Sequence, residues 1–142
     1  MRVFVDTNLW VYRLDRRAPE KSAFIRDWLR ALAREHEIVI STQVLVELRS
    51  ALTRKLKPAL SWLDTQAALD ALAEFEVVPA NANLVLDAHE LARIHRLSWF
   101  DALIIEAAIR SNCTRLYSED LQHGQRFGVL EVNNPFLEAP NP

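Results

Sequence analysis

The sequence begins MRVFVDTN, residues 1–8, and this stretch decides the fold that we expect for the chain. Arg2–Val5 is expected to be a short buried β-strand, because Val3, Phe4 and Val5 form an apolar run. Asp6 ends that run and is followed by Thr7 and Asn8, whose side chains also carry oxygen. In open parallel sheets, ligands bind beyond the carboxyl ends of the strands. Asp6 is therefore a candidate binding residue, although an N-cap or a turn would account for an acid here equally well.

The rest of the chain alternates strand patterns with helix patterns. Further strands are expected at Glu37–Ile40, Phe75–Val78, Arg115–Tyr117 and Val129–Val132. Helices are expected at Leu9–Leu14, Pro19–Glu35, Gln43–Lys55, Trp62–Glu74, Leu84–His95 and Trp99–Arg110. This alternation predicts an α/β fold, a three-layer sandwich in which helices flank a mostly parallel central sheet of about five short strands. We expect one domain over residues 1–136 and an irregular tail over residues 137–142.

Composition narrows the class of protein. The chain has 142 residues, of which half are apolar and only 2 are glycine, and this favours one helix-rich domain. No apolar run is long enough to span a bilayer, and the acid at Asp6 interrupts any signal peptide, so a soluble cytoplasmic protein is expected. Cys113 is the only cysteine and is expected to be a buried apolar residue, and the 4 histidines form no zinc pattern. The formal net charge is -2, and this chain therefore lacks the strongly basic character that is typical of many nucleic-acid-binding proteins.

Three more acids have contexts like that of Asp6. Glu47 lies inside an amphipathic helix, where it is either a solvated charge paired with a nearby arginine or a side chain facing a cleft. Asp101 closes a capping box that begins at Ser98, and capping alone explains an acid at this place. Asp120 follows a predicted strand and starts a turn, and Glu119 competes with it for the inward position.

Acids drawn from distant segments repel one another unless a cation joins them. Asp6, Glu47, Asp101 and Asp120 together would carry a charge near -4. Oxygen ligands are those that Mg²⁺ and Mn²⁺ prefer, so either ion is the expected cofactor. Thr7, Asn8, Ser118 and Glu119 are candidate supporting residues. Such a site is suited to metal-assisted attack of water on a phosphodiester, and we therefore expect a small metal-dependent ribonuclease.

Four motifs taken in order give the chain a family resemblance. They are VFVDTN at residues 3–8, ISTQVLVE at 40–47, SWFDALI at 98–104 and LYSEDL at 116–121. With these motifs the chain, from about residue 2 to residue 136, resembles the PIN-domain family and most of all the VapC toxins of bacterial toxin–antitoxin pairs. The resemblance implies a parallel sheet flanked by helices and a Mg²⁺- or Mn²⁺-dependent endoribonuclease. It also implies a homodimer and a small antitoxin that lays a tail, often with a basic residue, into the active-site groove.

By motif match, the same resemblance makes Asp6, Glu47, Asp101 and Asp120 the catalytic, metal-site carboxylates. Asn8 and Ser118 match positions that support such a site by hydrogen bonding, and Ser118 stands where the family commonly has threonine.

Cations outside an acidic site are needed to guide RNA toward it. The candidates are Arg13, Arg16, Arg49, Arg54 and Lys55. Trp10, Trp99 and His123 are candidates for stacking on unpaired bases, although a tryptophan is more often a core residue.

Two other functions compete with the nuclease. A dehalogenase-type phosphatase would need a second acid where this chain has Asn8, and a catalytic lysine that none of its 3 lysines matches. A non-catalytic module could instead hold the basic tail of a partner in an acidic groove. Metal-dependent cleavage would distinguish the nuclease from such a module.

Overall fold

The strand that opens the chain lies inside a six-stranded sheet with the order β3-β2-β1-β4-β6-β5. The computed structural model describes residues 1–138. Its strands are β1 (Arg2–Val5), β2 (Glu37–Ser41), β3 (Glu76–Val78), β4 (Arg115–Tyr117), β5 (Arg126–Phe127) and β6 (Leu130–Asn133). All neighbouring strands are parallel except β5, which pairs antiparallel with β6.

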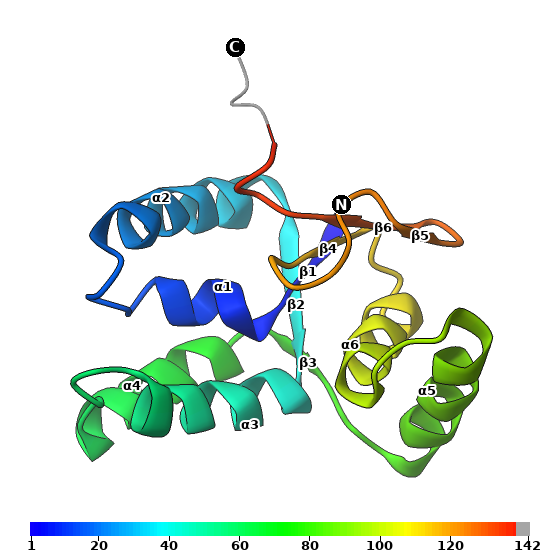
Figure 1. Cartoon of the computed structure of the whole chain (residues 1–142), viewed down its shortest axis with the longest axis horizontal. Helices are drawn as coiled ribbons and strands as arrows, with labels where there is room; N and C mark the ends of the chain where they lie inside the picture. Colours follow the sequence, from blue (N-terminus) through cyan, green and yellow to red (C-terminus); the bar gives the residue numbers. More distant parts are fainter. Residues whose placement is uncertain (139–142) are drawn as a thin grey trace.

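Helices cover both faces of this sheet. They are α1 (Thr7–Tyr12), α2 (Pro19–Glu35), α3 (Thr42–Ser50), α4 (Trp62–Ala73), α5 (Ala82–His95) and α6 (Trp99–Arg110), with a π-helical turn η1 (Ala51–Lys55) directly after α3. Figure 1 shows α1 to α4 on one side of the strands and α5 with α6 on the other. The predicted three-layer α/β sandwich with a mostly parallel sheet is confirmed.

The structure corrects several predicted boundaries. The sheet has six strands rather than about five, because β5 is a strand of 2 residues that was not predicted. The helix expected from Leu9 begins at Thr7, since Asp6 already acts as its N-cap. The helix expected over Gln43–Lys55 is α-helical only to Ser50. Leu137 and Glu138 have no helix or strand, and residues 139–142 of the predicted tail lie outside the described residues.

The core lies under the central strands. Val3, Phe4 and Val5 of β1 are fully buried, as expected for a strand covered on both faces. Cys113 is buried, as predicted, and burial raises the pKa of its thiol. Within residues 1–138, no helix combines the length and the apolar character needed to cross a membrane. The cytoplasmic location stays a prediction.

The order of the strands creates a crevice beside β1. From β1 the chain builds β2 and β3 toward one edge and then returns to place β4 on the other side of β1. Val5 of β1 is in register with Tyr117 of β4, so the residues that follow them, Asp6 and Ser118, lie side by side. Ligands in open α/β sheets bind at such a switch point, beyond the carboxyl ends of the strands.

Candidate functional site

Asp6 lies at the centre of the polar groups that gather at this crevice. Its carboxylate Oδ1 accepts a hydrogen bond from the backbone N–H of Thr7 at 2.7 Å and so caps α1. Its Oδ2 accepts a hydrogen bond from the Ser118 hydroxyl at 2.9 Å. The capping role considered from the sequence is therefore real, and the same side chain still faces the crevice. Only 8% of Asp6 is exposed.

Asn8 connects Asp6 with Asp120. Its side-chain Nδ2 lies 3.0 Å from Oδ2 of Asp120, 3.3 Å from the Ser118 hydroxyl and 3.4 Å from Oδ2 of Asp6. Its Oδ1 accepts a hydrogen bond from the backbone N–H of Glu119 at 3.2 Å. Because one amide contacts both segments, Asn8 fixes the turn after β4 against the start of α1.

Glu119 and Asp120 point to different partners. The Asp120 carboxylate contacts Asn8, whereas the Glu119 carboxylate forms an ion pair with Lys21 of α2, with Nζ and Oε1 at 3.2 Å. The sequence left open which of the two acids faces Asp6, and these contacts favour Asp120.

Glu47 reaches the site from α3. The Ser41 hydroxyl caps this helix by accepting a hydrogen bond from the N–H of Val44, so α3 begins directly after β2. The Thr7 hydroxyl donates a hydrogen bond to Oε1 of Glu47 at 3.0 Å. In the described part of the chain, no ion pair joins Glu47 to Arg49 or Arg54. Of the two roles considered for Glu47, the structure supports the cleft-facing one.

Asp101 enters from the opposite layer, in the first turn of α6. The Ser98 hydroxyl accepts a hydrogen bond from the Asp101 N–H at 3.3 Å, which confirms Ser98 as the N-cap of α6. Among the described residues, the hydrogen bond from the Ser98 N–H to the Asp101 carboxylate that would complete the predicted capping box is not present. Gln43 of α3 donates a hydrogen bond from Nε2 to the carbonyl oxygen of Phe100 at 3.2 Å, so the two helix layers meet beside Asp101.

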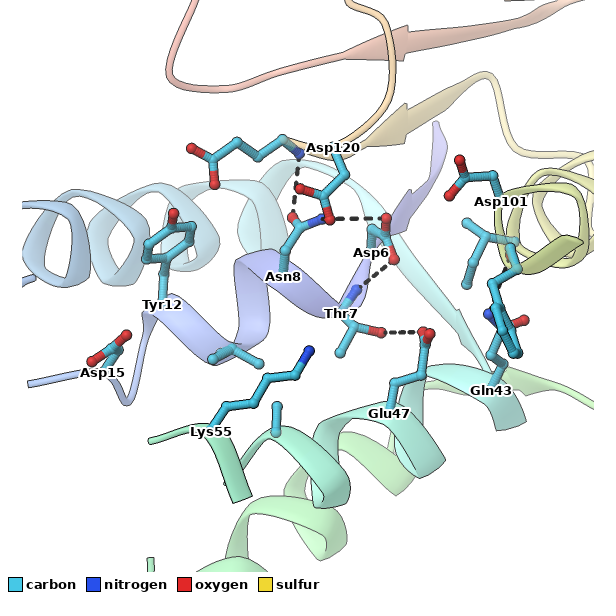
Figure 2. A pocket seen from close by; sticks show the side chains of 15 residues that line it. Asp6, Thr7, Asn8, Tyr12, Asp15, Gln43, Glu47, Lys55, Asp101 and Asp120 are labelled. Carbon is cyan, nitrogen blue, oxygen red and sulfur yellow. Dashed lines mark hydrogen bonds between the residues drawn. The ribbon is translucent and has the colours of Figure 1, made fainter. Parts of the chain in front are cut away.

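The four predicted carboxylates line one pocket of about 340 Å³, together with Asp15 and Glu119. Lys55 is the only lysine or arginine among its described lining residues. In Figure 2 the Asp6 carboxylate lies between those of Asp120, Asp101 and Glu47. Asp15 and Glu119 are paired with Arg17 and Lys21, which lie outside the pocket lining. The four remaining acids have only Lys55 beside them in the lining, so the pocket is acidic and will attract cations.

The electrostatics of Asp6 follow from this crowding. Burial raises the pKa of Asp6 to about 7, and the nearby charges of Glu47 and Asp120 act in the same direction. The hydrogen bonds from Ser118 and Thr7 oppose this rise in the pKa but do not cancel it. Within residues 1–138, an ionised Asp6 is thus a buried charge that forms no ion pair with a basic side chain.

The donor set fits a hard divalent ion. Carboxylate, amide and hydroxyl oxygens line the pocket, and these are the ligands of Mg²⁺ and Mn²⁺. Among residues 1–138, no three acidic, histidine or cysteine side chains are close enough to form a ready-made metal cage. Mg²⁺ usually keeps several waters and binds only one or two carboxylates directly, so it does not need such a cage.

The π-helical turn explains why Lys55 lies in this pocket. Along an α-helix, each step of four residues turns the side chain by about 40° around the axis, so Glu47 and a residue eight positions later would diverge. In η1 the N–H of Leu56 instead donates to the carbonyl oxygen of Ala51 at 3.2 Å, five residues back. This wider turn contains more residues, so each residue rotates less about the helix axis. The 40° rotation between Glu47 and Ala51 is therefore offset between Ala51 and Lys55. Glu47, Ala51 and Lys55 therefore all line the pocket.

The other predicted RNA-binding cations lie elsewhere. Arg49 and Arg54 line a groove between α3 and α4, and Arg13 and Arg16 line a further pocket beside the α1–α2 loop. The sequence offered no way to choose among these faces.

The stacking role considered for Trp10 is wrong. Trp10 is 2% exposed and packs against Phe75, with ring centroids 5.5 Å apart. Trp99 packs against His89, and the ring nitrogen Nδ1 of His123 accepts a hydrogen bond from the N–H of Asn134. None of these aromatic residues lines the acidic pocket.

Several pocket residues were not singled out from the sequence. They are Tyr12, Asp15, Gln43 and Phe100, with the apolar residues Val11, Ala51 and Ile104. Phe100 had a usable signal in the sequence, since it directly precedes Asp101 at the start of a predicted helix. In the structure its side chain is 63% exposed. The others lie on helix faces or in a loop whose orientation no local pattern reveals.

Comparison of the chain with known proteins identifies its family. The family model described as PIN domain matches residues 3–126, which is most of the chain. The chain belongs to the PIN domain family. The resemblance based on the four sequence motifs is thereby confirmed. No curated protein matches the chain significantly.

Solved structures share the fold of this PIN domain. VapBC2 from Rickettsia felis, bound to a DNA fragment from its promoter, is 24% identical, with a TM-score of 0.68 over 94% of this chain and 98% of that chain. VapBC-1 from nontypeable Haemophilus influenzae is 18% identical, with a TM-score of 0.65 over 94% and 98%. Mycobacterium tuberculosis VapC20, described as a toxin that cleaves the sarcin-ricin loop, is 21% identical, with a TM-score of 0.56 over 83% and 89%. At these identities the likeness concerns the fold.

Proposed function

We propose that this PIN domain is a Mg²⁺- or Mn²⁺-dependent endoribonuclease and the toxin of a type II toxin–antitoxin pair. The observation that supports the proposal best is the convergence of Asp6, Glu47, Asp101 and Asp120 in one acidic pocket. These residues come from four separate segments of the chain and meet at the strand-order switch beside β1. VapC-type structural neighbours are consistent with the proposal.

Asp6 and Asp120 would hold the metal ion directly, because Asn8 already links their carboxylates. Glu47 and Asp101 would act through water. When bound, the ion supplies Lewis acidity to the phosphodiester and lowers the pKa of the attacking water. The chain needs no nucleophile of its own for hydrolysis. Lys55 lines the same pocket, and we expect its ammonium group to contact a phosphate of the RNA.

The experiment that tests this function is cleavage of a mixed single-stranded RNA with Mg²⁺ or Mn²⁺, with and without chelator. Wild-type protein should cleave only with metal, and a folded Asp6→Asn, Asp101→Asn variant should not cleave. Cleavage that persists in the chelator would overturn the metal-dependent mechanism. Metal binding and tight capture of a basic peptide, with no cleavage of any RNA, would favour the non-catalytic acidic-groove module instead.

An antitoxin with a basic tail is the partner that we propose for this pocket. Its four acids without an ion-pair partner, Asp6, Glu47, Asp101 and Asp120, favour an arginine or lysine side chain of a partner. Structural neighbours have been crystallised as toxin–antitoxin complexes, which supports a partner of this class. An arginine-containing peptide should inhibit cleavage by the wild type competitively. Its dissociation constant, measured by direct binding, should rise when Glu47 and Asp101 are replaced by amides. We also propose a homodimer, which light scattering of the purified protein tests.

Asn8→Ala should reduce cleavage by roughly 10- to 100-fold, the usual effect of removing a hydrogen-bonding partner of a metal ligand. The physical reason is that Asn8 connects the carboxylates of Asp6 and Asp120 and holds the backbone of Glu119. The measurement is kcat/KM as a function of Mg²⁺ concentration, and the Mg²⁺ concentration for half-maximal activity should rise in the variant. The matched control is Asn83→Ala on the exposed surface of α5. Equal activity of both variants would show that Asn8 has no positioning role.

Lys55→Ala should weaken RNA binding and lower the slope of log affinity against log salt by roughly 0.7, the value for one lost phosphate contact on a single strand. Lys55 is the only described cation in the pocket, so its loss is not compensated there. Fluorescence anisotropy at several salt concentrations measures the slope. Lys55→Arg should restore it, because the charge returns. A slope unchanged by Lys55→Ala would remove Lys55 from the RNA path.

A further inference from the structure

A second pocket lies beside the acidic one and has the opposite charge. It has a volume of about 520 Å³ and is formed by the α1–α2 loop, the first turns of α2 and the segment between η1 and α4. Its charged lining residues are Arg13, Arg16, Arg26 and Lys57, with Asp15 and Asp64 as the acids. We call it the basic pocket. Asp15 lines both pockets, so the two are adjacent.

The acid at the border between the pockets is already neutralised. Arg17 donates to both oxygens of Asp15, from Nε to Oδ1 at 3.0 Å and from Nη2 to Oδ2 at 3.1 Å. This guanidinium lowers the pKa of Asp15, so the carboxylate remains ionised and paired. An anionic polymer that passes from one pocket to the other is therefore not repelled by a free carboxylate at Asp15, because Arg17 neutralises it.

In the part of the chain that the structure describes, the cations of the basic pocket, by contrast, form no ion pair with an acid. Within residues 1–138, no carboxylate forms an ion pair with Arg13, Arg16 or Lys57. Arg13 lies 5.4 Å from the centre of the Trp10 ring, and burial lowers the pKa of its guanidinium. Arg26 donates only to the hydroxyl and the carbonyl of Ser22. These guanidinium and ammonium groups are available to an anion with several charges.

Two segments of the chain present residues to both pockets. At the end of η1, Lys55 lines the acidic pocket, and Lys57, two residues later, lines the basic pocket. At the end of α1, Tyr12 lines the acidic pocket, and the neighbouring Arg13 lines the basic pocket. The cations thus follow a path that starts in the acidic pocket and leads out of it.

We propose that the basic pocket binds phosphates of the same RNA strand whose scissile phosphate lies in the acidic pocket. This inference rests on the proposed nuclease function and adds a path for the substrate. A polynucleotide suits the arrangement because it carries one charge per nucleotide and can occupy both pockets with one strand. Contacts of this kind fix the position of the strand without reading its sequence.

The test compares two double variants in a chelator-containing buffer, both built on Asp6→Asn to prevent cleavage. Arg16→Ala, Lys57→Ala removes two cations of the basic pocket, and Arg30→Ala, Arg34→Ala removes two exposed cations of α2 outside both pockets. For a single-stranded 12-nucleotide RNA, the first pair should lower the salt slope by roughly 1.4 and weaken binding about 10- to 30-fold near 0.1 M salt. The second pair should change the slope far less. Circular dichroism confirms that both variants fold.

A cleavage experiment on the metal-loaded protein with an intact Asp6 gives a second readout. The kcat/KM advantage of the 12-nucleotide RNA over a trinucleotide should shrink in Arg16→Ala, Lys57→Ala and persist in Arg30→Ala, Arg34→Ala. If the wild type cleaves RNA but the two double variants behave alike, the inference fails and the nuclease function stands. If the wild type neither binds nor cleaves any RNA, both fail. Polyglutamate serves as a competitor with the charge of an acidic protein. If it displaces RNA from the wild type at the same concentration as unlabelled RNA does, the pocket is assigned to an acidic protein and the inference is overturned.

Discussion

Replacing Asp6 by asparagine should raise the melting temperature of the metal-free protein at pH 8 and should also abolish metal-dependent RNA cleavage. The two effects have one cause. The Asp6 carboxylate is buried, its pKa is raised to about 7, and Glu47 and Asp120 repel its charge. The features that would hold a cation in the site therefore destabilise the folded chain when no cation is bound.

The sign of the pH dependence follows from the direction of the shift. The folded pKa of Asp6, about 7, lies above the ordinary value of 3.8, so the folded protein holds the proton more tightly than the unfolded chain does. The contribution of Asp6 to the stability of the metal-free protein should therefore be most favourable below about pH 4 and should be lost as the pH rises to about 7. A shift of this size corresponds to roughly 4 kcal/mol. Asparagine has no charge to bury, but it loses charge-assisted hydrogen bonds, so we expect a net gain of about 2 kcal/mol at pH 8, or roughly 5 °C.

Thermal unfolding in a chelator at pH 5, 6, 7 and 8 measures this effect. The difference between Asp6→Asn and wild type should grow with pH, and added Mg²⁺ should stabilise only the wild type, more at pH 8 than at pH 6. RNA cleavage by the variant should fall by at least about 100-fold. Asp27→Asn on the exposed face of α2 should change neither property. A lower melting temperature of metal-free Asp6→Asn at pH 8 would contradict the account of Asp6 as an uncompensated charge.

Trp10→Ala should cost about 3–5 kcal/mol of unfolding free energy, the usual loss for a large aromatic side chain in a core. Trp10 is 2% exposed, contacts Phe75 and donates a hydrogen bond from Nε1 to the Val5 carbonyl at 3.1 Å. This bond ties α1 to the end of β1 and so helps to fix Asp6. Urea unfolding should show the loss, and the melting temperature should fall by roughly 10 °C.

The matched control for Trp10 is Trp62→Ala, since Trp62 is 69% exposed at the start of α4 and should change the stability by less than about 0.5 kcal/mol. The base-stacking hypothesis makes the opposite prediction for Trp10. Under that hypothesis, Trp10→Ala would weaken RNA binding and leave the stability unchanged. That outcome would reverse the assignment of Trp10 to the core.

Elements with strong local signals were predicted to the residue. The bounds of β1, α2, α6 and β4 agree with those expected from the sequence. In α2, Pro19 at the first position and a regular apolar stripe define the helix, and in α6 Ser98 provides the cap. Such signals depend only on neighbouring residues, and this is why the sequence alone reveals them.

Other elements depend on contacts between distant residues. β5 has only 2 residues, Arg126 and Phe127, too few to show an alternating pattern, and it forms because the turn at Gly128, with φ of 63°, folds it back on β6. Apolar spacing likewise does not distinguish the π-helical turn from the α-helix before it. Asp6, Asp101 and Asp120 were singled out because strand ends and caps mark them, whereas Glu47 was named from its motif. The partners that orient them, such as Thr7 for Glu47, are 40 residues away in the chain.

The π-helical turn Ala51–Lys55 also affects how relatives of this chain should be aligned. A turn closed over five residues instead of four contains one extra residue, so a homologue with a single deletion here would have a continuous α-helix. The residues that follow would keep their directions, because the loss of one residue and the loss of the wide turn offset each other. The gap would still change the pocket, because it removes a residue from the turn that brings Lys55 into it. Homologues with and without the gap would then have pockets of different charge, and would be expected to differ in the RNAs that they accept.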